Sequence, residues 1–202
     1  LSADVAKYNI STGAFTAKVF SNGHAQSDSF VWYEGKLYVG CYSGAYLVEY
    51  DPATNKVTQL IPDGLKDAYS QIRIHSLAAG DGKIFFSTIP GTEQLGGCIG
   101  WYDLQTKELY AERNVVEDQT IISLVYEDGY LYGASSVSNG TSSVATQTEA
   151  KVLVYDVANK ASVGTYSVSS VTGSNEIKYV SGLAADPNYD TNGKIWGVVG
   201  QA

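Results

Sequence analysis

Methionine is absent from this 202-residue sequence, and cysteine, histidine and proline are scarce. A complete primary translation product cannot lack methionine, so we expect a processed or excised part of one, beginning here at Leu1. The two cysteines, Cys41 and Cys98, are too few for a disulfide framework or a cysteine-rich metal site. Because they fall on different predicted strands, we expect two buried free thiols. With only His24 and His75, a site with several histidine ligands cannot form.

Clustered basic residues and long apolar runs are missing too. The chain carries 13 Lys and Arg against 21 Asp and Glu, which gives a net charge of -8 and a pI of about 4.6. Phosphate contacts need clustered cations, so no nucleic-acid partner is expected. No apolar stretch reaches the ~18 residues of a membrane span, and no signal peptide is recognisable. The acidic, Ser- and Thr-rich composition favours an extracellular or cell-surface location.

A unit of four short strands recurs along the chain, and its clearest copy begins at His75. A turn glycine recurs as Gly35, Gly82 and Gly129, in two steps of 47 residues (35 to 82 and 82 to 129), with a fourth copy at Gly193. An acidic residue or Asn precedes each glycine. Such pairs are typical of two-residue hairpins with glycine at positive φ, which we expect at the first three copies.

Two further features repeat in phase with this turn. A serine lies six residues before the turn glycine, as Ser29, Ser76 and Ser123, with a looser copy at Ser181. A strand-closing pair followed by a turn appears as Tyr8-Asn9, Tyr50-Asp51, Tyr102-Asp103 and Tyr155-Asp156. The strands between these markers are rich in β-branched and aromatic residues. A repeat of 40 to 50 residues with four strands indicates an all-β protein built from propeller blades.

The chain resembles the broad class of bacterial β-propellers with YVTN-like, quinoprotein-like repeats. Blades of that class close a strand with Tyr-Asp or Leu-Asp and then a Thr-Gly or Thr-Asn-Lys turn. The resemblance covers almost the whole chain and implies the fold, but it leaves the activity open because propellers host many functions. Ala17 stands where the quinoprotein repeats carry Trp, and this departure leaves a bound quinone without support. No cofactor is expected.

We expect a single propeller domain over residues 1–202. Its blades are predicted at about 24–61, 75–114, 120–168 and, shared between the termini, 180–202 plus 1–20. In this arrangement Asp4 to Asn9 pairs with Lys194 to Gly200 and closes a ring of about four blades, which removes exposed sheet edges. The alternative is a segment of a propeller with six to eight blades.

Long loops are concentrated at one end of the predicted strands. They are Gly91 to Gly97, Ser138 to Ala150, Pro62 to Ile74 and Ser169 to Tyr179. Binding residues usually lie on such loops, although loops also accept neutral insertions. The short turns at Thr54 to Lys56, Thr106-Lys107 and Asn159-Lys160 are expected on the opposite face and should be dispensable.

The loop-rich end supplies the candidate binding residues, which are Tyr69, Arg73, His75, Glu93 and Glu176. His75 is either a proton donor or metal ligand, or a hydrogen-bonded structural residue. A carboxylate pair drawn from Asp28, Glu93, Asp118 and Glu176 would suit glycoside hydrolysis, but solvated rim carboxylates are the commoner outcome.

No catalytic residue is assigned, because no Gly-x-Ser-x-Gly elbow and no Cys-His pair occur. The segment from Asp186 to Gly193 alternates oxygen ligands as calcium loops do. Its glycine falls at the eighth position rather than the sixth. A hairpin turn is the preferred interpretation, and no metal site is expected.

These features predict a non-catalytic binding or interaction domain of a larger secreted or surface bacterial protein. Its ligand would be a carbohydrate or a protein, bound at the loop-rich face through flat amphipathic Tyr and Trp side chains. The first alternative is part of a propeller enzyme acting on polysaccharide, a lyase or hydrolase that uses His75, Arg73 and rim carboxylates. The second alternative is a structural spacer.

Overall fold

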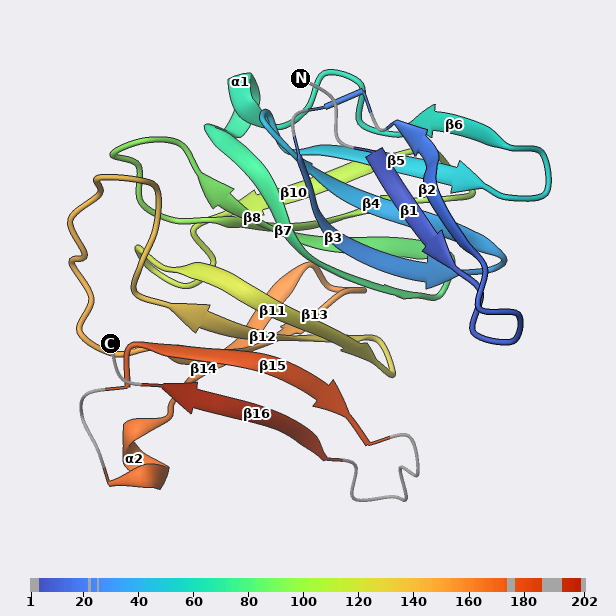
Figure 1. The fold of residues 1–202 in the computed structure, drawn as a ribbon. Helices are drawn as coiled ribbons and strands as arrows, with labels where there is room; N and C mark the ends of the chain where they lie inside the picture. The colour runs from blue at the N-terminus through green and yellow to red at the C-terminus, as the bar shows by residue number, and fades with distance from the viewer. Residues whose placement is uncertain (1–3, 22, 25, 174–176, 187–193, 201–202) are drawn as a thin grey trace.

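Three four-stranded antiparallel blades follow one another in the computed structural model, which describes residues 4–21, 23–24, 26–173, 177–186 and 194–200 (Figure 1). Blade 1 is β3 (Gln26–Tyr33), β4 (Lys36–Tyr42), β5 (Tyr46–Asp51) and β6 (Lys56–Gln59). Blade 2 is β7 (Gln71–Gly80), β8 (Lys83–Pro90), β9 (Cys98–Asp103) and β10 (Leu109–Arg113). Blade 3 is β11 (Thr120–Glu127), β12 (Tyr130–Ser136), β13 (Lys151–Asp156) and β14 (Ala161–Ser167).

A two-stranded hairpin flanks the blades at each end. The N-terminal hairpin is β1 (Asp4–Tyr8) and β2 (Phe15–Ser21), and the C-terminal hairpin is β15 (Tyr179–Ala185) and β16 (Ile195–Gly200). The helices α1 (Lys66–Tyr69) and α2 (Ser169–Thr172) have four residues each. Within the described ranges, no helix has the length and apolarity that crossing a membrane requires.

The first strands of successive units pack side by side, in the order β3, β7, β11 and β15. They are therefore the inner strands beside the axis, as in a propeller. The repeated serine lies here. The Leu124 N–H donates to Ser76 Oγ at 3.1 Å, and the Leu183 N–H donates to Ser123 Oγ at 3.0 Å. Ser29 Oγ donates to the Ile74 carbonyl at 3.1 Å. The serine repeat thus ties each inner strand to the next.

Each blade buries both faces of its middle strands against its neighbours. In β8, Ile84 and Phe86 pack in the core shared with blade 1, whereas the intervening Phe85 packs in the core shared with blade 3. This alternation follows from the period of two in a strand. We call the packed layers between consecutive blades seam 1–2 and seam 2–3. Burial on both faces explains the nearly continuous apolar runs of the middle strands.

The strand-closing pairs have separate roles. Tyr50, Tyr102 and Tyr155 are buried, and the Asp that follows each of them accepts backbone N–H groups from the next turn. Asp103 Oδ1, for example, accepts the N–H groups of Gln105 and Thr106, both at 2.9 Å. An Asp at this position holds the turn in place by satisfying its backbone donors.

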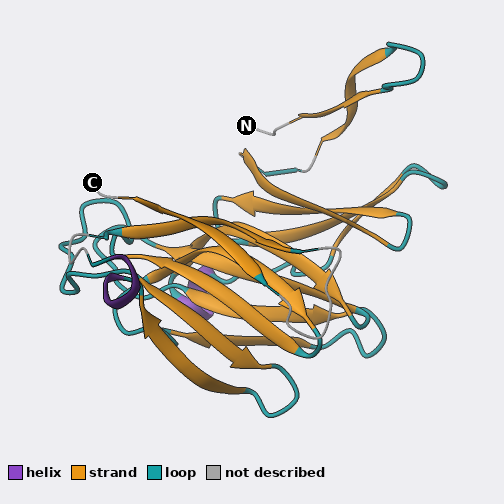
Figure 2. Ribbon diagram, turned by 90° about the horizontal axis from the view of Figure 1, so that it is seen from below, coloured by secondary structure: helices purple, strands orange, loops and turns teal. Residues whose placement is uncertain are grey.

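The predicted pairing of Asp4 to Asn9 with Lys194 to Gly200 is wrong for this structure. Among the described residues β1 pairs only with β2, and β16 pairs only with β15. The two hairpins lie at opposite ends of the array of blades (Figures 1 and 2). Three full blades and two hairpins curve through only part of a ring. The blade count is that of part of a propeller, the second of the two predicted arrangements.

The two ends of the strands form two different faces. The turn face carries the short turns, 34–35, 52–55, 81–82, 104–108, 128–129 and 157–160. The loop face carries the longer connections, 60–70, 91–97, 114–119 and 137–150. Backbone hydrogen bonds join these loops to one another, from Gly91 to Ser70 and from Glu93 to Thr141, both at 2.8 Å. Much of the loop face is therefore occupied by contacts between loops.

Both cysteines are buried thiols outside any disulfide, as predicted. Burial raises the pKa of the Cys98 thiol to about 12, which suppresses the reactive thiolate. We therefore expect a thiol reagent at pH 8 to label neither cysteine in the folded protein and both after denaturation in urea. Labelling of the native chain at the rate of a free thiol would contradict the buried placement. The Cys98→Ala variant retains only Cys41, so any labelling of this variant in its folded state is assigned to Cys41.

The turn glycines Gly35, Gly82 and Gly129 have φ of 79°, 69° and 86°, which confirms their predicted positive φ. A Cβ added at Gly82 would meet no atom within 4 Å, so replacement is costly only because of the backbone conformation. Gly82→Ala should therefore lower the free energy of unfolding by about 1 kcal/mol, measured by urea denaturation. Gly82→Asn is the control, because Asn tolerates positive φ. Equal stability of the Ala variant and the wild type would exclude this turn type.

Candidate functional site

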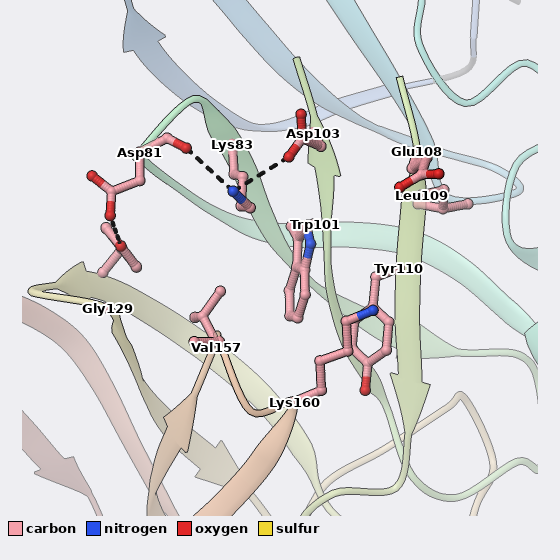
Figure 3. A pocket seen from close by; sticks show the side chains of 12 residues that line it. Asp81, Lys83, Trp101, Asp103, Glu108, Leu109, Tyr110, Gly129, Val157 and Lys160 are labelled. Atoms are coloured by element: carbon pink, nitrogen blue, oxygen red, sulfur yellow. Dashed lines mark hydrogen bonds and ion pairs between the residues drawn. The ribbon is translucent and has the colours of Figure 1, made fainter. Parts of the chain in front are cut away.

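A cavity of about 650 Å³ opens on the turn face at seam 2–3 (Figure 3). Strands β8, β9 and β10 of blade 2 supply one wall, and the turns before β12 and β14 of blade 3 supply the other. Its lining residues are Asp81, Lys83, Trp101, Asp103, Glu108, Leu109, Tyr110, Tyr126, Gly129, Val157, Ala158 and Lys160. We call this cavity the seam pocket.

Aromatic rings form the apolar part of the seam pocket. Trp101 and Tyr110 face each other across the β9–β10 ladder, and their rings stack with centroids 4.2 Å apart. The Lys160 Nζ lies 4.7 Å from the centroid of the Tyr110 ring, a cation–π contact. Trp101 is only 5% exposed, so its ring is held in place by seam 2–3 and its edge borders the pocket (Figure 3).

Charged groups form the rim of the seam pocket. The Lys83 Nζ lies 3.3 Å from an Asp103 carboxylate oxygen and donates to the Asp81 carbonyl at 3.3 Å. The Tyr126 hydroxyl donates to the Asp81 carboxylate. Burial, together with this bond, raises the pKa of Tyr126 to about 12, so the phenol stays protonated. Three carboxylates and two ammonium groups thus surround the aromatic part.

The chemistry of this rim suits binding better than catalysis. The backbone N–H of Thr106 is the main cause that holds the pKa of Asp103 below its usual value, with the Gln105 N–H and Lys83 adding to it. A general acid for glycoside hydrolysis needs the opposite shift. The residues that line the seam pocket include no Ser, Thr, Cys or His, so the pocket itself offers no usual nucleophile–base pair.

The structure brings together part of the predicted loop-face site. Arg73 on β7 donates through Nη1 to Asp28 Oδ1 at 2.5 Å, and its guanidinium lies 4.6 Å from the centroid of the Tyr42 ring. His75 lies two residues further along β7, at a β-bulge. Burial lowers the pKa of His75; the Asp28 charge opposes this shift and the Arg73 charge adds to it. Arg73, Asp28 and His75 therefore form one electrostatic cluster on the inner strands.

The remaining predicted residues lie elsewhere or cannot be placed. Tyr69 ends α1 and packs partly buried against seam 1–2. Glu93 is exposed in the 91–97 loop at a φ of 60°. Glu176, like most of the calcium-like segment from Asp186 to Gly193, lies outside the described residues. The binding role of these residues stays a prediction. No group of three or more potential metal-binding side chains occurs in the part of the chain that the structure describes.

The seam pocket was not predicted from the sequence, although one signal pointed to it. The position before the strand-closing tyrosine holds Lys7, Glu49, Trp101 and Val154 in the four copies. Only the second-blade copy, Trp101, is aromatic. This difference marks seam 2–3 as the one that accommodates an additional ring. Lys160, by contrast, was expected to be dispensable, because a turn lysine carries no such signal.

The fold and its blades define the class of this protein as a β-propeller, here with three full blades. No protein-family model matches the sequence, and no curated protein matches it. Solved structures do match. A luciferin-regenerating enzyme aligns with a TM-score of 0.60 at 13% identity, over 96% of this chain and 61% of its own. The β-propeller domain of Cps50 (Swd1) from Myceliophthora thermophila aligns with a TM-score of 0.51 at 11% identity, over 79% and 45%.

A third match is the quinohemoprotein alcohol dehydrogenase ADHIIG of Pseudomonas putida, with a TM-score of 0.53 at 14% identity, over 86% of this chain and 31% of its own. The chain thus spans between about a third and three fifths of these three structures. Such low identities show the fold alone. The propeller fold implied by the resemblance is confirmed, whereas the YVTN-like repeat family and the bacterial source stay predictions.

The two histidines give the stability of the folded chain a measurable pH dependence. Burial lowers the pKa of both His24 and His75 below 6.5, so their neutral forms are favoured by folding. The corresponding stability is fully present above pH 6.5 and is lost as the pH falls through the folded pKa values. NMR titration should place both midpoints below 6.5, and His24→Gln assigns the remaining signal to His75. A His75 midpoint above 6.5 would contradict its burial.

Proposed function

We propose that this chain is a non-catalytic binding domain and that its seam pocket binds a carbohydrate. The observation that carries the proposal is the Trp101–Tyr110 stack set within a rim of carboxylates and ammonium groups. The Trp101 edge and the Tyr110 ring border the pocket and offer apolar contact to a sugar ring, and the charged rim exchanges hydrogen bonds with hydroxyl groups. The pocket's volume lies within the range of small-molecule sites.

The charge of the pocket narrows the ligand class. Lys83 is engaged by Asp103 and by the Asp81 carbonyl, so the rim offers little free positive charge to a phosphate or sulfate group. Glu108 and Lys160 are both exposed at the rim. A neutral oligosaccharide, which has many hydroxyls and no formal charge, fits this balance better than an anion or a cation.

The proposal moves the ligand from the predicted loop face to the turn face. The loop-face site around Arg73 and His75, with a carbohydrate or a protein as ligand, is the competing proposal. Arg73 and Asp28 already neutralise each other there, and Tyr42 covers the guanidinium, so fewer polar groups are left for a ligand. We also propose an extracellular or surface location in a larger bacterial protein, because the chain is acidic and exposed glycans are found there.

A polysaccharide-cleaving enzyme is the second candidate, and one observation favours it. His75 is half-buried on an inner strand, and the charges of Asp28 and Arg73 both act on it, which is the kind of environment that tunes a proton donor. Product formation from a bound polysaccharide, abolished by His75→Ala, would establish this function in place of simple binding.

The test is a glycan array followed by calorimetry on the glycan it selects. Lys160→Gln and Glu108→Gln should each weaken binding by about tenfold, because each removes one charge-assisted hydrogen bond. Lys56→Gln, the same change on the turn face of blade 1, is the matched control and should bind as the wild type does. A loss caused by Glu93→Gln but not by Lys160→Gln would transfer the site to the loop face.

A further inference from the structure

The two ends of the array of blades expose large apolar side chains that the repeat elsewhere places at buried or half-buried positions. At the C-terminal end these are Trp196, Val198 and Val199 of β16, and at the N-terminal end Phe30 and Trp32 of β3. The repeat register shows what each of them faces in a complete seam. None of these five residues lines the seam pocket.

Trp196 is the third residue after its turn glycine, as Tyr38 and Phe85 are in blades 1 and 2. Tyr38 and Phe85 are 1% and 0% exposed because each packs against the following blade, whereas Trp196 is 61% exposed. The outer face of the C-terminal hairpin is therefore built like the face that a blade presents to its successor. Among the described residues, nothing covers it.

The N-terminal end has the matching half of a seam. Trp32 lies three residues after Ser29, as Tyr126 does after Ser123. Tyr126 stacks on Phe85 of the preceding blade at 4.4 Å and 17°, but Trp32 is 61% exposed. The N-terminal hairpin covers only the outer part of this face, where Val5 and Phe20 pack on blade 1. A groove of about 410 Å³ runs beside β1 and is lined by Val5, Phe30 and Leu37, among others.

The strand edges match as well. In the complete blades the second strand pairs with the third, as in β4–β5, β8–β9 and β12–β13. The N-terminal hairpin supplies a third and a fourth strand, and the C-terminal hairpin supplies a first and a second. In the described part of the chain, β1 and β16 each have one sheet partner. An unpaired edge of this kind accepts a strand from another chain.

We propose that the C-terminal hairpin of a second copy of this chain fills the groove beside β1, with β16 pairing along β1. Trp196 of that copy then stacks on Trp32, as Phe85 stacks on Tyr126 within one chain. The chain's own hairpin lies at the opposite end of the array (Figures 1 and 2), so a second copy supplies it without bending the blades. The contact continues the seams already present between successive units.

Two such contacts close a ring. Each copy contributes three complete blades, and each contact makes one composite blade, which gives a closed pair of eight blades. The interface is head-to-tail, and a head-to-tail contact must close or else grow into a filament. Closure also removes both unpaired edges, which an open array leaves available for aggregation.

Light scattering on the size-fractionated 202-residue chain should give twice the chain mass of 21.6 kDa. Trp32→Glu and Trp196→Glu should each reduce the mass to that of one chain while the circular dichroism spectrum is unchanged, because both side chains are exposed in the single chain. Leu109→Glu is the control. Leu109 is also an exposed apolar strand residue, 40% exposed, but it lies on β10 of the middle blade, away from both ends, so the pair should persist.

Mixing the two tryptophan variants is the decisive arm. A pair formed from one Trp32→Glu chain and one Trp196→Glu chain keeps one intact Trp32–Trp196 contact, so a mixed pair should reappear although neither variant pairs alone. A wild-type chain that stays single would overturn the proposal. So would a pair that survives both substitutions, or a mass that keeps increasing with concentration.

Discussion

Burial of each blade between two others is the constraint on which this structure depends. A single blade has no core of its own, because residues such as Phe85 and Ile84 are covered only by the neighbours on either side. The apolar runs of the middle strands, the inter-blade serine bonds and the tight turns all serve this stacking. The same constraint explains why apolar residues are exposed where the stacking stops, at Trp32 and Trp196.

The parts of the fold that depend on local sequence could be predicted. Acidic-Gly pairs determined the hairpin turns because only certain residues accept positive φ, and the Tyr-Asp pairs marked strand ends because Asp satisfies the donors of the following turn. The relation between the two ends of the chain could not be predicted in this way. Whether β1 meets β16 depends on the angle between successive blades, and no residue pattern in one blade encodes that angle.

The candidate site was harder to predict for a similar reason. Loop length drew attention to the loop face, but length does not reveal that loops such as 91–97 and 137–150 bind one another. The seam pocket lies between two blades at the turn face, and Lys160 reaches it from the far side of the seam. Only the aromatic residue at position 101 carried a signal of it in the sequence. The low-identity matches add the fold and no chemistry.

The bulge beside each repeated serine gives the repeat one position that is free to differ. In β3, β7 and β11 the register shifts between Ser27 and Ser29, Ile74 and Ser76, and Ile121 and Ser123. The bulged residues are Asp28, His75 and Ile122: an acid, a base and a hydrocarbon at one structural position. A bulged residue is not matched to a partner across the ladder. Duplicated blades can therefore acquire different chemistry next to the axis while the seams that hold them remain the same.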